Sequence, residues 1–391
     1  MTSAKSMKPI GAMHIIDTLA AAGAERVAVN IVNALPREKY APYLCTTRAD
    51  GPLDALVERD VVRLRLNRTS RFDFGAAVRL RRFIQMHGIR IIHAHSAALF
   101  VARLAAWGTD AKILWHAHYG RYAVEDHAAY HYRMGTAGID GALTVNKEMA
   151  EWCSRRLKVP AEKVWYLPNP VALEEKAAPL ASPLPGTKGS RIICLANFRP
   201  EKDHFTLARA MARAVCEVPS AHLILAGKTN DENYKRDVQK EIAALGIEGN
   251  VSVLGERHDV AAILGSCDIG VLSSSSEGLP MSLLEYGAAG LPAIATDVGQ
   301  CGDVLDYGRT GMLVPSGKPG ELAAAMIQLL QSGAERSRLA ALFRERVIKT
   351  YSSKTVVREI CGVYRTVLGE KAGPLEQAAA ERDVVTSGSL S

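Results

Sequence analysis

Short apolar runs alternate with longer amphipathic stretches along most of the chain. Ile10–Ile16 has the continuous apolar character of a buried strand, and residues 25–35 follow it with the spacing of a helix. The same plan recurs and predicts further strands at 43–46 and 61–66, within 91–96, 112–120, 141–146 and 163–170, and at 192–196, 221–226, 251–254, 268–272, 293–296 and 312–314. It predicts further helices at 74–87, 205–215, 234–245, 321–330 and 354–368. Strands that alternate with helices are typical of a parallel, doubly wound sheet with helices on both faces.

A break in this pattern divides the chain. Residues 173–190 are rich in proline, glycine and charged residues, which is typical of a linker. A chain of 391 residues is also too long for one hydrophobic core. We therefore expect an N-terminal domain at 1–172 and a second domain at 191–352. A helix at 353–371 follows, and the small, polar residues 372–391 are expected to be disordered.

The stretch Ser273–Gly287 gathers polar and acidic residues between two apolar elements. A strand at 268–272 leads into four serines, and the next helix opens at Pro280. Proline suits the first position of a helix, because an N–H at that position would have no partner within the helix. The free N–H groups of a helix start form an anion site. Glu277 and Glu285 add two carboxylates beside it, which suits a ligand with phosphates and hydroxyls such as a nucleotide sugar. The alternative is a solvated helix face that carries two acids.

The same stretch resembles the signature of a known enzyme family. Seven residues separate Glu277 from Glu285, and 288–292 and 295–299 extend the match, so that the run resembles retaining glycosyltransferases of the GT-B fold, family 4. The resemblance implies two Rossmann-like, doubly wound parallel-sheet domains that face each other across a cleft. The first would be the acceptor side and the second would bind the donor. It also implies that the helix at 353–371 crosses back to the N-terminal domain.

Cations near residues 199–203, at the start of a predicted helix, would neutralise a diphosphate. Lys202 matches the lysine of the family, whereas Asn197 stands where the family usually has an arginine, and Arg199 is the expected substitute. By resemblance, Lys202 and Arg199 hold the diphosphate, Glu277 holds the sugar and Glu285 holds the ribose hydroxyls. The other residues expected at the donor site are Gly23, Asn197, Gly227, Arg257, Asp259, Val260, Gly278, Leu279, Pro280 and Ser282.

Two of these donor residues have a plain structural alternative. Gly23 follows Ala22 in a turn that resembles the Gly-Gly-Ala-Glu turn of the family, with alanine in place of the first glycine, and it also suits an ordinary tight turn. Asp259 precedes a predicted helix, where it would serve equally as an N-cap.

Three histidines, His95, His116 and His118, follow strands whose carboxyl ends meet at one edge of a parallel sheet. His118 resembles the family histidine that lies near the transferred sugar, which implies a catalytic role, whereas His95 and His116 would face the acceptor. Tyr119 and Arg121 begin an aromatic, basic stretch through residue 133 that we interpret as an acceptor-site loop or lid. The alternatives are structural histidines, a plain loop-helix surface, and a metal site. We expect no metal, because no Cys or acidic partner lies at ligand spacing.

Charge is uneven along the chain, whose net charge is +7. Residues 1–172 hold 24 Lys and Arg against 15 Asp and Glu, and arginines crowd the stretch from 59 to 90. This favours either a solubilising surface or contact with an anionic membrane. Nucleic-acid binding is disfavoured because aromatic content is 6% and no nucleic-acid module is present. The seven scattered cysteines and the absence of a long apolar run predict free thiols in a cytoplasmic protein, at the inner face of the cell membrane if it is peripheral.

These observations predict a retaining glycosyltransferase of the hexosyltransferase type that needs no cofactor. It would move a sugar from a nucleotide-diphosphate sugar, most often a UDP-sugar in this family, to a glycan or lipid-linked acceptor in cell-surface polysaccharide or lipopolysaccharide synthesis. The alternatives are a nucleotide-sugar epimerase on the same fold and a non-catalytic nucleotide-sugar binding protein. An NAD-dependent oxidoreductase is disfavoured because no G-x-G-x-x-G is present.

Overall fold

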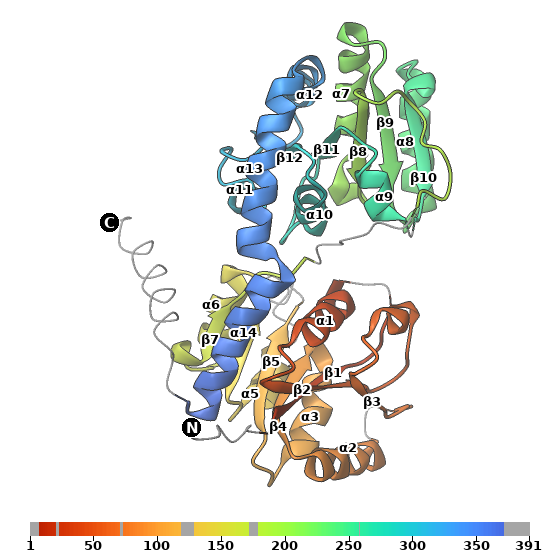
Figure 1. Ribbon diagram of the computed structural model, residues 1–391. Coiled ribbons are helices and arrows are strands. Elements are labelled where there is room, and N and C mark those ends of the chain that lie inside the picture. The colour runs from red at the N-terminus through yellow and green to blue at the C-terminus, as the bar shows by residue number, and fades with distance from the viewer. Residues whose placement is uncertain are drawn as a thin grey trace. The chain divides into compact units, whose positions relative to one another are not determined.

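The computed structural model describes residues 8–20, 23–70, 73–118, 129–171, 179–257 and 259–370 (Figure 1). The chain folds into two compact units. Unit 1 comprises Met1–Pro170 together with Ser353–Ser391, and unit 2 comprises Val171–Ser352. The chain therefore passes from the first unit into the second and returns, and each unit is described by itself below.

Unit 1 is built on a seven-stranded sheet in which all paired strands are parallel. Its strands are β1 (Ile10–Ile16), β2 (Tyr40–Thr46), β3 (Val62–Arg65), β4 (Ile89–His95), β5 (Lys112–Ala117), β6 (Gly141–Thr144) and β7 (Val164–Tyr166). Their order is β3-β2-β1-β4-β5-β6-β7, so the direction of winding reverses between β1 and β4. A reversal of this kind opens a crevice at the carboxyl ends of the two strands, where ligands bind in doubly wound folds.

Helices cover both faces of this sheet. They are α1 (Gly23–Ala34), α2 (Phe74–His87), α3 (Leu99–Ala106), α5 (Ala129–Thr136), α6 (Lys147–Arg155) and α14 (Ser353–Leu368), with short 3₁₀ turns at Pro52–Leu56, Ser96–Ala98 and Ala161–Lys163. One apolar core lies under α2, α3 and α6. Another joins α1 to α14, which packs Val356 and Ile360 beside Val27 and Ile31. The last helix is thus part of unit 1 although it follows unit 2 in the chain.

Unit 2 repeats the plan with six parallel strands. They are β8 (Arg191–Leu195), β9 (His222–Ala226), β10 (Val251–Gly255), β11 (Ile269–Leu272), β12 (Ala293–Thr296) and β13 (Met312–Val314). Their order is β10-β9-β8-β11-β12-β13, which places the reversal between β8 and β11. The helices are α7 (His204–Glu217), α8 (Glu232–Ala244), α9 (Val260–Leu264), α10 (Met281–Ala289), α11 (Cys301–Val304), α12 (Pro319–Gln331) and α13 (Gly333–Tyr351), with 3₁₀ turns η4 (Pro200–Lys202) and η5 (Glu248–Asn250). Two parallel-sheet α/β units confirm the predicted fold class.

Two local expectations are corrected, and one helix was not predicted. The sequence did not predict α13, because this charged helix buries only a narrow stripe at Leu339, Phe343, Val347 and Tyr351. Residues 130–133, expected within a loop, belong to α5, where the Tyr132 ring stacks on the buried Trp115 with ring centroids 5.1 Å apart. Pro280 is the N-cap residue of α10 and not its first helical residue.

None of the described helices is long and apolar enough to cross a bilayer.

Candidate functional site

The reversal point of the unit 2 sheet brings two loops together. The loop after β8 contains η4, and the loop after β11 contains the serine run. Because β8 and β11 are neighbouring parallel strands, both loops leave the same edge of the sheet. This adjacency places Lys202, from the first loop, beside Glu277 from the second, although the two lie 75 positions apart in the sequence.

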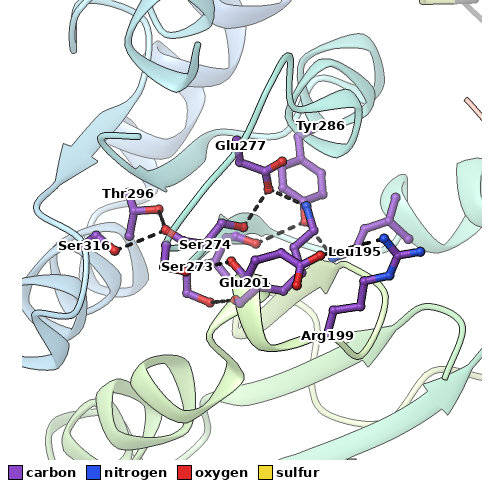
Figure 2. A network of polar contacts seen from close by, with 12 residues as sticks. Leu195, Arg199, Glu201, Ser273, Ser274, Glu277, Tyr286, Thr296 and Ser316 are labelled. Carbon is purple, nitrogen blue, oxygen red and sulfur yellow. Dashed lines mark hydrogen bonds and ion pairs between the residues drawn. The ribbon is translucent and has the colours of Figure 1, made fainter. Parts of the chain in front are cut away.

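Lys202 and Glu277 form an ion pair. The Lys202 Nζ donates to Glu277 Oε1 at 2.5 Å, and the Ser274 Oγ donates to the same oxygen at 2.6 Å (Figure 2). The exposed fraction is 21% for the Lys202 side chain and 8% for that of Glu277. A charge pair with so little exposure interacts more strongly than one in open water. The pair is therefore a pre-oriented cation beside a carboxylate at the carboxyl edge of the sheet.

Serines tie the two loops to each other through main-chain oxygens. The Ser273 Oγ donates to the carbonyls of Lys202 and Asp203 at 2.9 and 3.1 Å, and the Ser275 N–H donates to the Glu201 carbonyl at 2.8 Å. Thr296 Oγ1 donates to the Ser274 carbonyl at 2.6 Å, which attaches the end of β12 (Figure 2). Short hydroxyl side chains explain the serine run, because they reach main-chain acceptors across a narrow gap. The network holds the lysine and the glutamate in place.

Gly299 supports the Glu277 loop from the other side, and sequence reasoning did not single it out. Its φ of +54° lies in the left-handed region, and a Cβ at this position would overlap the Glu277 carbonyl oxygen. The next residue, Gln300, donates its N–H to the Gly278 carbonyl at 3.1 Å. The only sequence signal for this role was the place of Gly299 within the extended match to the family signature.

We expect Gly299→Ala to destabilise unit 2 by more than the roughly 1 kcal/mol that a positive φ alone costs a non-glycine residue. The added methyl group must displace the carbonyl of Glu277, and so the substitution should also misplace that carboxylate. Gly317→Ala is the matched control, since Gly317 has a φ of +68° with open space around the new methyl group. Thermal unfolding of both variants measures the difference. Equal losses of stability would contradict the proposed collision.

Helix α10 begins at the same edge of the sheet. Its N-cap residue Pro280 makes no side-chain hydrogen bond to the helix. No capping side chain therefore competes with a ligand for the N–H groups of the first turn, which includes Ser282. The buried Tyr286 fixes the helix, because its hydroxyl accepts from the Leu195 N–H at 2.7 Å and donates to the Val271 carbonyl at 3.1 Å (Figure 2). Glu285 precedes Tyr286 and is partly buried. Gly278 and Leu279, also expected at the donor site, lie in the loop that leads into α10.

Asn197 and Gly227 connect the ends of β8 and β9. The Asn197 Oδ1 accepts from the Lys228 N–H at 2.9 Å, and Gly227, at a φ of +158°, packs its backbone on the Ala196 carbonyl. Asn197 therefore has a structural partner at the position where arginine was expected. The side chain of Arg199 is 48% exposed and lies 3.8 Å from Glu201 (Figure 2). Its proposed role toward a diphosphate stays a prediction.

Arg257 and Asp259 bind each other through two hydrogen bonds of 2.7 and 2.6 Å. Asp259 also accepts from the Ala181 N–H at 2.8 Å, which ties the segment before β8 to this turn. The bond from the Arg257 guanidinium holds the pKa of the Asp259 carboxyl well below its usual range. Asp259 occupies the N-cap position before Val260, but its side chain makes no capping bond. Contact of these residues with a nucleotide base stays a prediction.

The unit 1 candidates gather at β4 and β5. His95 ends β4, His116 lies in β5 and His118 directly follows it, while Gly23 opens α1. The structure also brings in two histidines that sequence reasoning missed, His14 of β1 and His93 of β4. The His-x-His pattern of β4 was the available signal for His93, because alternate residues of a strand share one face. Strand β1 holds His14 alone and gave no such signal. Tyr119 and Arg121 lie outside the described residues.

Burial keeps these five histidines neutral. It lowers the pKa of His14 to about 3 and that of His118 to about 3. Burial, reinforced by neighbouring histidines, lowers the pKa of His93, His95 and His116 well below 6.5. At neutral pH each ring therefore carries one hydrogen, and offers one donor and one acceptor nitrogen.

Two family models match the chain on either side of residues 176–180. The model described as Glycosyltransferase Family 4 matches residues 21–175, and the model described as Glycosyl transferases group 1 matches residues 181–346. The second match contains η4, the serine run and α10.

Curated relatives match over part of their length. N-acetyl-alpha-D-glucosaminyl L-malate synthase of Bacillus anthracis is 32% identical over 177 residues, which is 45% of each chain. Phosphatidyl-myo-inositol mannosyltransferase of Mycolicibacterium smegmatis is 28% identical over 250 residues, 63% of this chain and 62% of that protein. The chain thus spans less than two thirds of the length of these relatives.

Solved structures share the fold. A glycosyltransferase from Rickettsia africae superposes with a TM-score of 0.76 at 18% identity, over 93% of this chain and all of that one. HepE of Anabaena, in complex with UDP, superposes with a TM-score of 0.75 at 17% identity, over 91% of this chain and all of that one.

Proposed function

The chain belongs to the family 4 glycosyltransferases, the group described as glycosyl transferases group 1, and from this premise we propose that it moves a sugar from a nucleotide-diphosphate sugar to a glycan or lipid-linked acceptor. A UDP-sugar is the donor we favour, with a GDP-sugar as the main alternative. HepE of Anabaena, which has the same fold, was solved with UDP and with UDP-glucose. The observation that supports the proposal most directly is the Lys202–Glu277 pair.

This pair matches the chemistry of sugar transfer. As the bond from sugar to diphosphate breaks, negative charge grows on the leaving phosphate, and a cation already in place stabilises that charge more in the transition state than before it. Lys202 would supply this charge, with Arg199 and the first turn of α10 beside it. Glu277 would accept hydrogen bonds from the sugar, and Glu285 from the ribose.

The state of Glu277 favours retention of configuration without a covalent intermediate. Its carboxylate already binds the Lys202 ammonium group and the Ser274 hydroxyl through one oxygen, and both interactions make it a weaker nucleophile. The acceptor hydroxyl would then attack on the face from which the diphosphate leaves and give its proton to the leaving phosphate oxygen. By its resemblance to the family histidine, His118 would also act on the transferred sugar.

A lipid-linked acceptor is supported by the names of two relatives. One is a phosphatidyl-myo-inositol mannosyltransferase, and another is a galactosyltransferase that acts on alpha-D-GlcNAc-diphosphoundecaprenol. The arginine-rich stretch is less basic than its sequence suggests, because Arg63 and Arg65 pair with Asp50 and Asp54, and Arg68 pairs with Asp17. Peripheral contact with an anionic membrane stays a prediction, which co-sedimentation with anionic and neutral vesicles would check.

A screen of nucleotide sugars tests the donor. The purified chain is heated with UDP-glucose, UDP-galactose, UDP-N-acetylglucosamine, GDP-mannose or ADP-glucose at about a hundred times the Kd expected for a donor. We expect one UDP-sugar to raise the melting temperature most, because a ligand at a hundred times its Kd adds about 2.7 kcal/mol to the stability of the folded state. The selected donor is then incubated with acceptors, and the anomeric configuration of the product is read by NMR.

Two controls limit the interpretation of that screen. NAD should leave the melting temperature unchanged, and Lys202→Met should keep most of the shift that the selected sugar produces, because we expect this substitution to act on kcat more than on donor binding. A shift with none of the five donors would contradict the proposed function. Conversion of the donor to its epimer without any acceptor would replace it with the epimerase alternative.

A further inference from the structure

The fold gathers five imidazole rings and one phenol inside unit 1. In the sheet, His14 of β1 is in register with His93 of β4, and His95 of β4 is in register with His116 of β5. His118 continues the same face two residues beyond His116. The face is covered by α14, from which the buried Tyr364 reaches the rings. Neighbouring strands at the reversal point of the sheet thus place the five rings together, and α14 brings Tyr364 to them.

The six groups are linked end to end by hydrogen bonds. On one side of Tyr364, His118 Nε2 meets His95 Nδ1 at 2.8 Å, His95 Nε2 meets His14 Nδ1 at 3.0 Å, and His14 Nε2 meets the Tyr364 hydroxyl at 3.2 Å. On the other side, the Tyr364 hydroxyl meets His93 Nδ1 at 2.8 Å, and His93 Nε2 meets His116 Nδ1 at 3.0 Å. The outer nitrogens, His118 Nδ1 and His116 Nε2, have no partner among the described residues and are buried.

Counting hydrogens makes this chain directional. Five neutral imidazoles and one phenol carry six hydrogens, and the five links need one hydrogen each. One hydrogen remains, and it must lie on one of the two outer nitrogens. If it lies on His118 Nδ1, every link donates toward His118 and His116 Nε2 is bare. If it lies on His116 Nε2, every link is reversed. Any other arrangement leaves two lone pairs or two hydrogens facing each other, or leaves the Tyr364 hydrogen without an acceptor in the chain.

Burial supports the assumption that all six groups are neutral. It raises the pKa of Tyr364 well above 10 and lowers the pKa of each of the five histidines in the cluster. Two histidine triads, 14/93/95 and 95/116/118, each bring ligand nitrogens within 4.8 Å of one another, which is also compatible with a metal ion. The hydrogen bonds already account for this closeness. An ion in either triad would have to break at least one of them.

We propose that these six groups form one proton wire in which Tyr364 couples the outer nitrogen of His118 to the outer nitrogen of His116. The wire reverses when a water or substrate hydroxyl gives a proton to the bare outer nitrogen, the five link hydrogens each move across their link, and the sixth leaves the other outer nitrogen for a water or substrate oxygen. Tyr364 is then a positioning residue, because it sets which form His118 presents without touching the substrate. The use of His118 Nδ1 toward the sugar rests on the proposed function, whereas the wire does not.

NMR of the full chain with ¹⁵N-labelled histidine tests the wire at neutral pH, because the shifts of Nδ1 and Nε2 show which nitrogen carries hydrogen. In the wild type we expect His118 Nδ1 and His116 Nε2 to be in opposite states. Tyr364→Phe removes the central link, so that each half orients by itself and the outer nitrogens show mixed states. Tyr40→Phe is the matched control, since Tyr40 is also buried against α14 and bonds only the Cys361 carbonyl in the described structure, at 3.4 Å.

Several outcomes would overturn the wire: two outer nitrogens in the same state in the wild type, unchanged tautomers in Tyr364→Phe, or an equal change in Tyr40→Phe. Zinc retained by the purified protein and bound at these nitrogens would do the same. In a transfer assay, Tyr364→Phe should lower kcat about tenfold, the kinetic equivalent of one lost buried hydrogen bond, with the donor KM unchanged. Changed tautomers with unchanged kcat would keep the wire and remove His118 from the proposed reaction.

Discussion

Replacing Lys202 with methionine should slow sugar transfer by about a thousandfold at saturating donor, because loss of one pre-oriented group that stabilises a developing oxyanion typically costs a factor of this order. The effect should fall on kcat more than on the KM for the donor, since the charge on the leaving phosphate is greatest in the transition state. Initial rates with the donor identified by thermal shift measure both constants.

The same substitution leaves the Glu277 carboxylate, 8% exposed, without its cation. Removing one partner of a pair this well buried should lower the stability of unit 2 by roughly 3 kcal/mol. Adding Glu277→Gln should restore most of that loss, because the second change removes the unpaired charge, and the double-mutant cycle measures the coupling. Activity should stay low in the double variant.

Lys240→Met is the matched control for the loss of a lysine. Lys240 lies on α8 of the same unit, 70% exposed, and pairs with Asp237 at 2.9 Å. Surface pairs of this kind contribute little, so both activity and stability should be close to those of the wild type. If Lys202→Met were as active as Lys240→Met, Lys202 would be only a structural partner of Glu277, and the proposed mechanism would fail.

Unit 1 should unfold in mild acid. A histidine with a lowered pKa in the folded state takes up its proton only on unfolding, so its contribution is complete above about pH 6.5 and is lost as the pH falls. Each buried histidine then costs about 1.4 kcal/mol per pH unit below that value. For the five in the cluster the loss between about pH 7.5 and 5.5 is roughly 7 kcal/mol, comparable to the whole stability of a domain.

Tryptophan fluorescence isolates this unit, because all four tryptophans, at 107, 115, 152 and 165, belong to unit 1. Denaturant unfolding followed by fluorescence at several pH values gives the number of protons taken up. His116→Gln should lower that number by about one. The control is His131→Gln, on the exposed surface of α5, which should not change it. A stability that is constant between about pH 7.5 and 5.5 would show that these rings are charged or accessible in the folded protein.

Local patterns accounted for much of the fold. Continuous apolar runs such as Ile10–Ile16 and the helical spacing of Phe74–His87 predicted elements whose bounds the structure reproduces, because both depend on residues close in sequence. Helix α13 and helix α5 were missed for a related reason. Helix α13 buries only a narrow apolar stripe, and helix α5 is short and buries few residues. In both, the helical repeat of apolar residues does not stand out from the polar and charged positions around it.

The site depended on neighbours that no local pattern shows. Sequence reasoning selected both Lys202 and Glu277, the latter from its family-like surroundings, but their ion pair exists because β8 and β11 lie side by side where the strand order reverses. Strand order is decided by how helices pack on the two faces of the sheet, which is a property of the folded unit. Gly299 and Tyr286 became visible as supports only once their contacts with Glu277 and with β8 were known.

The histidine cluster shows the same division. By itself, the sequence determined that α/β elements alternate, that two parallel sheets form, and that histidines lie at the carboxyl ends of β4 and β5. The tertiary structure alone decided that His14 and His93 join them and that Tyr364, 271 residues after His93, closes the chain of hydrogen bonds. The reason is that periodicity records which face of an element is buried, whereas the partners on that face come from distant segments brought together by packing.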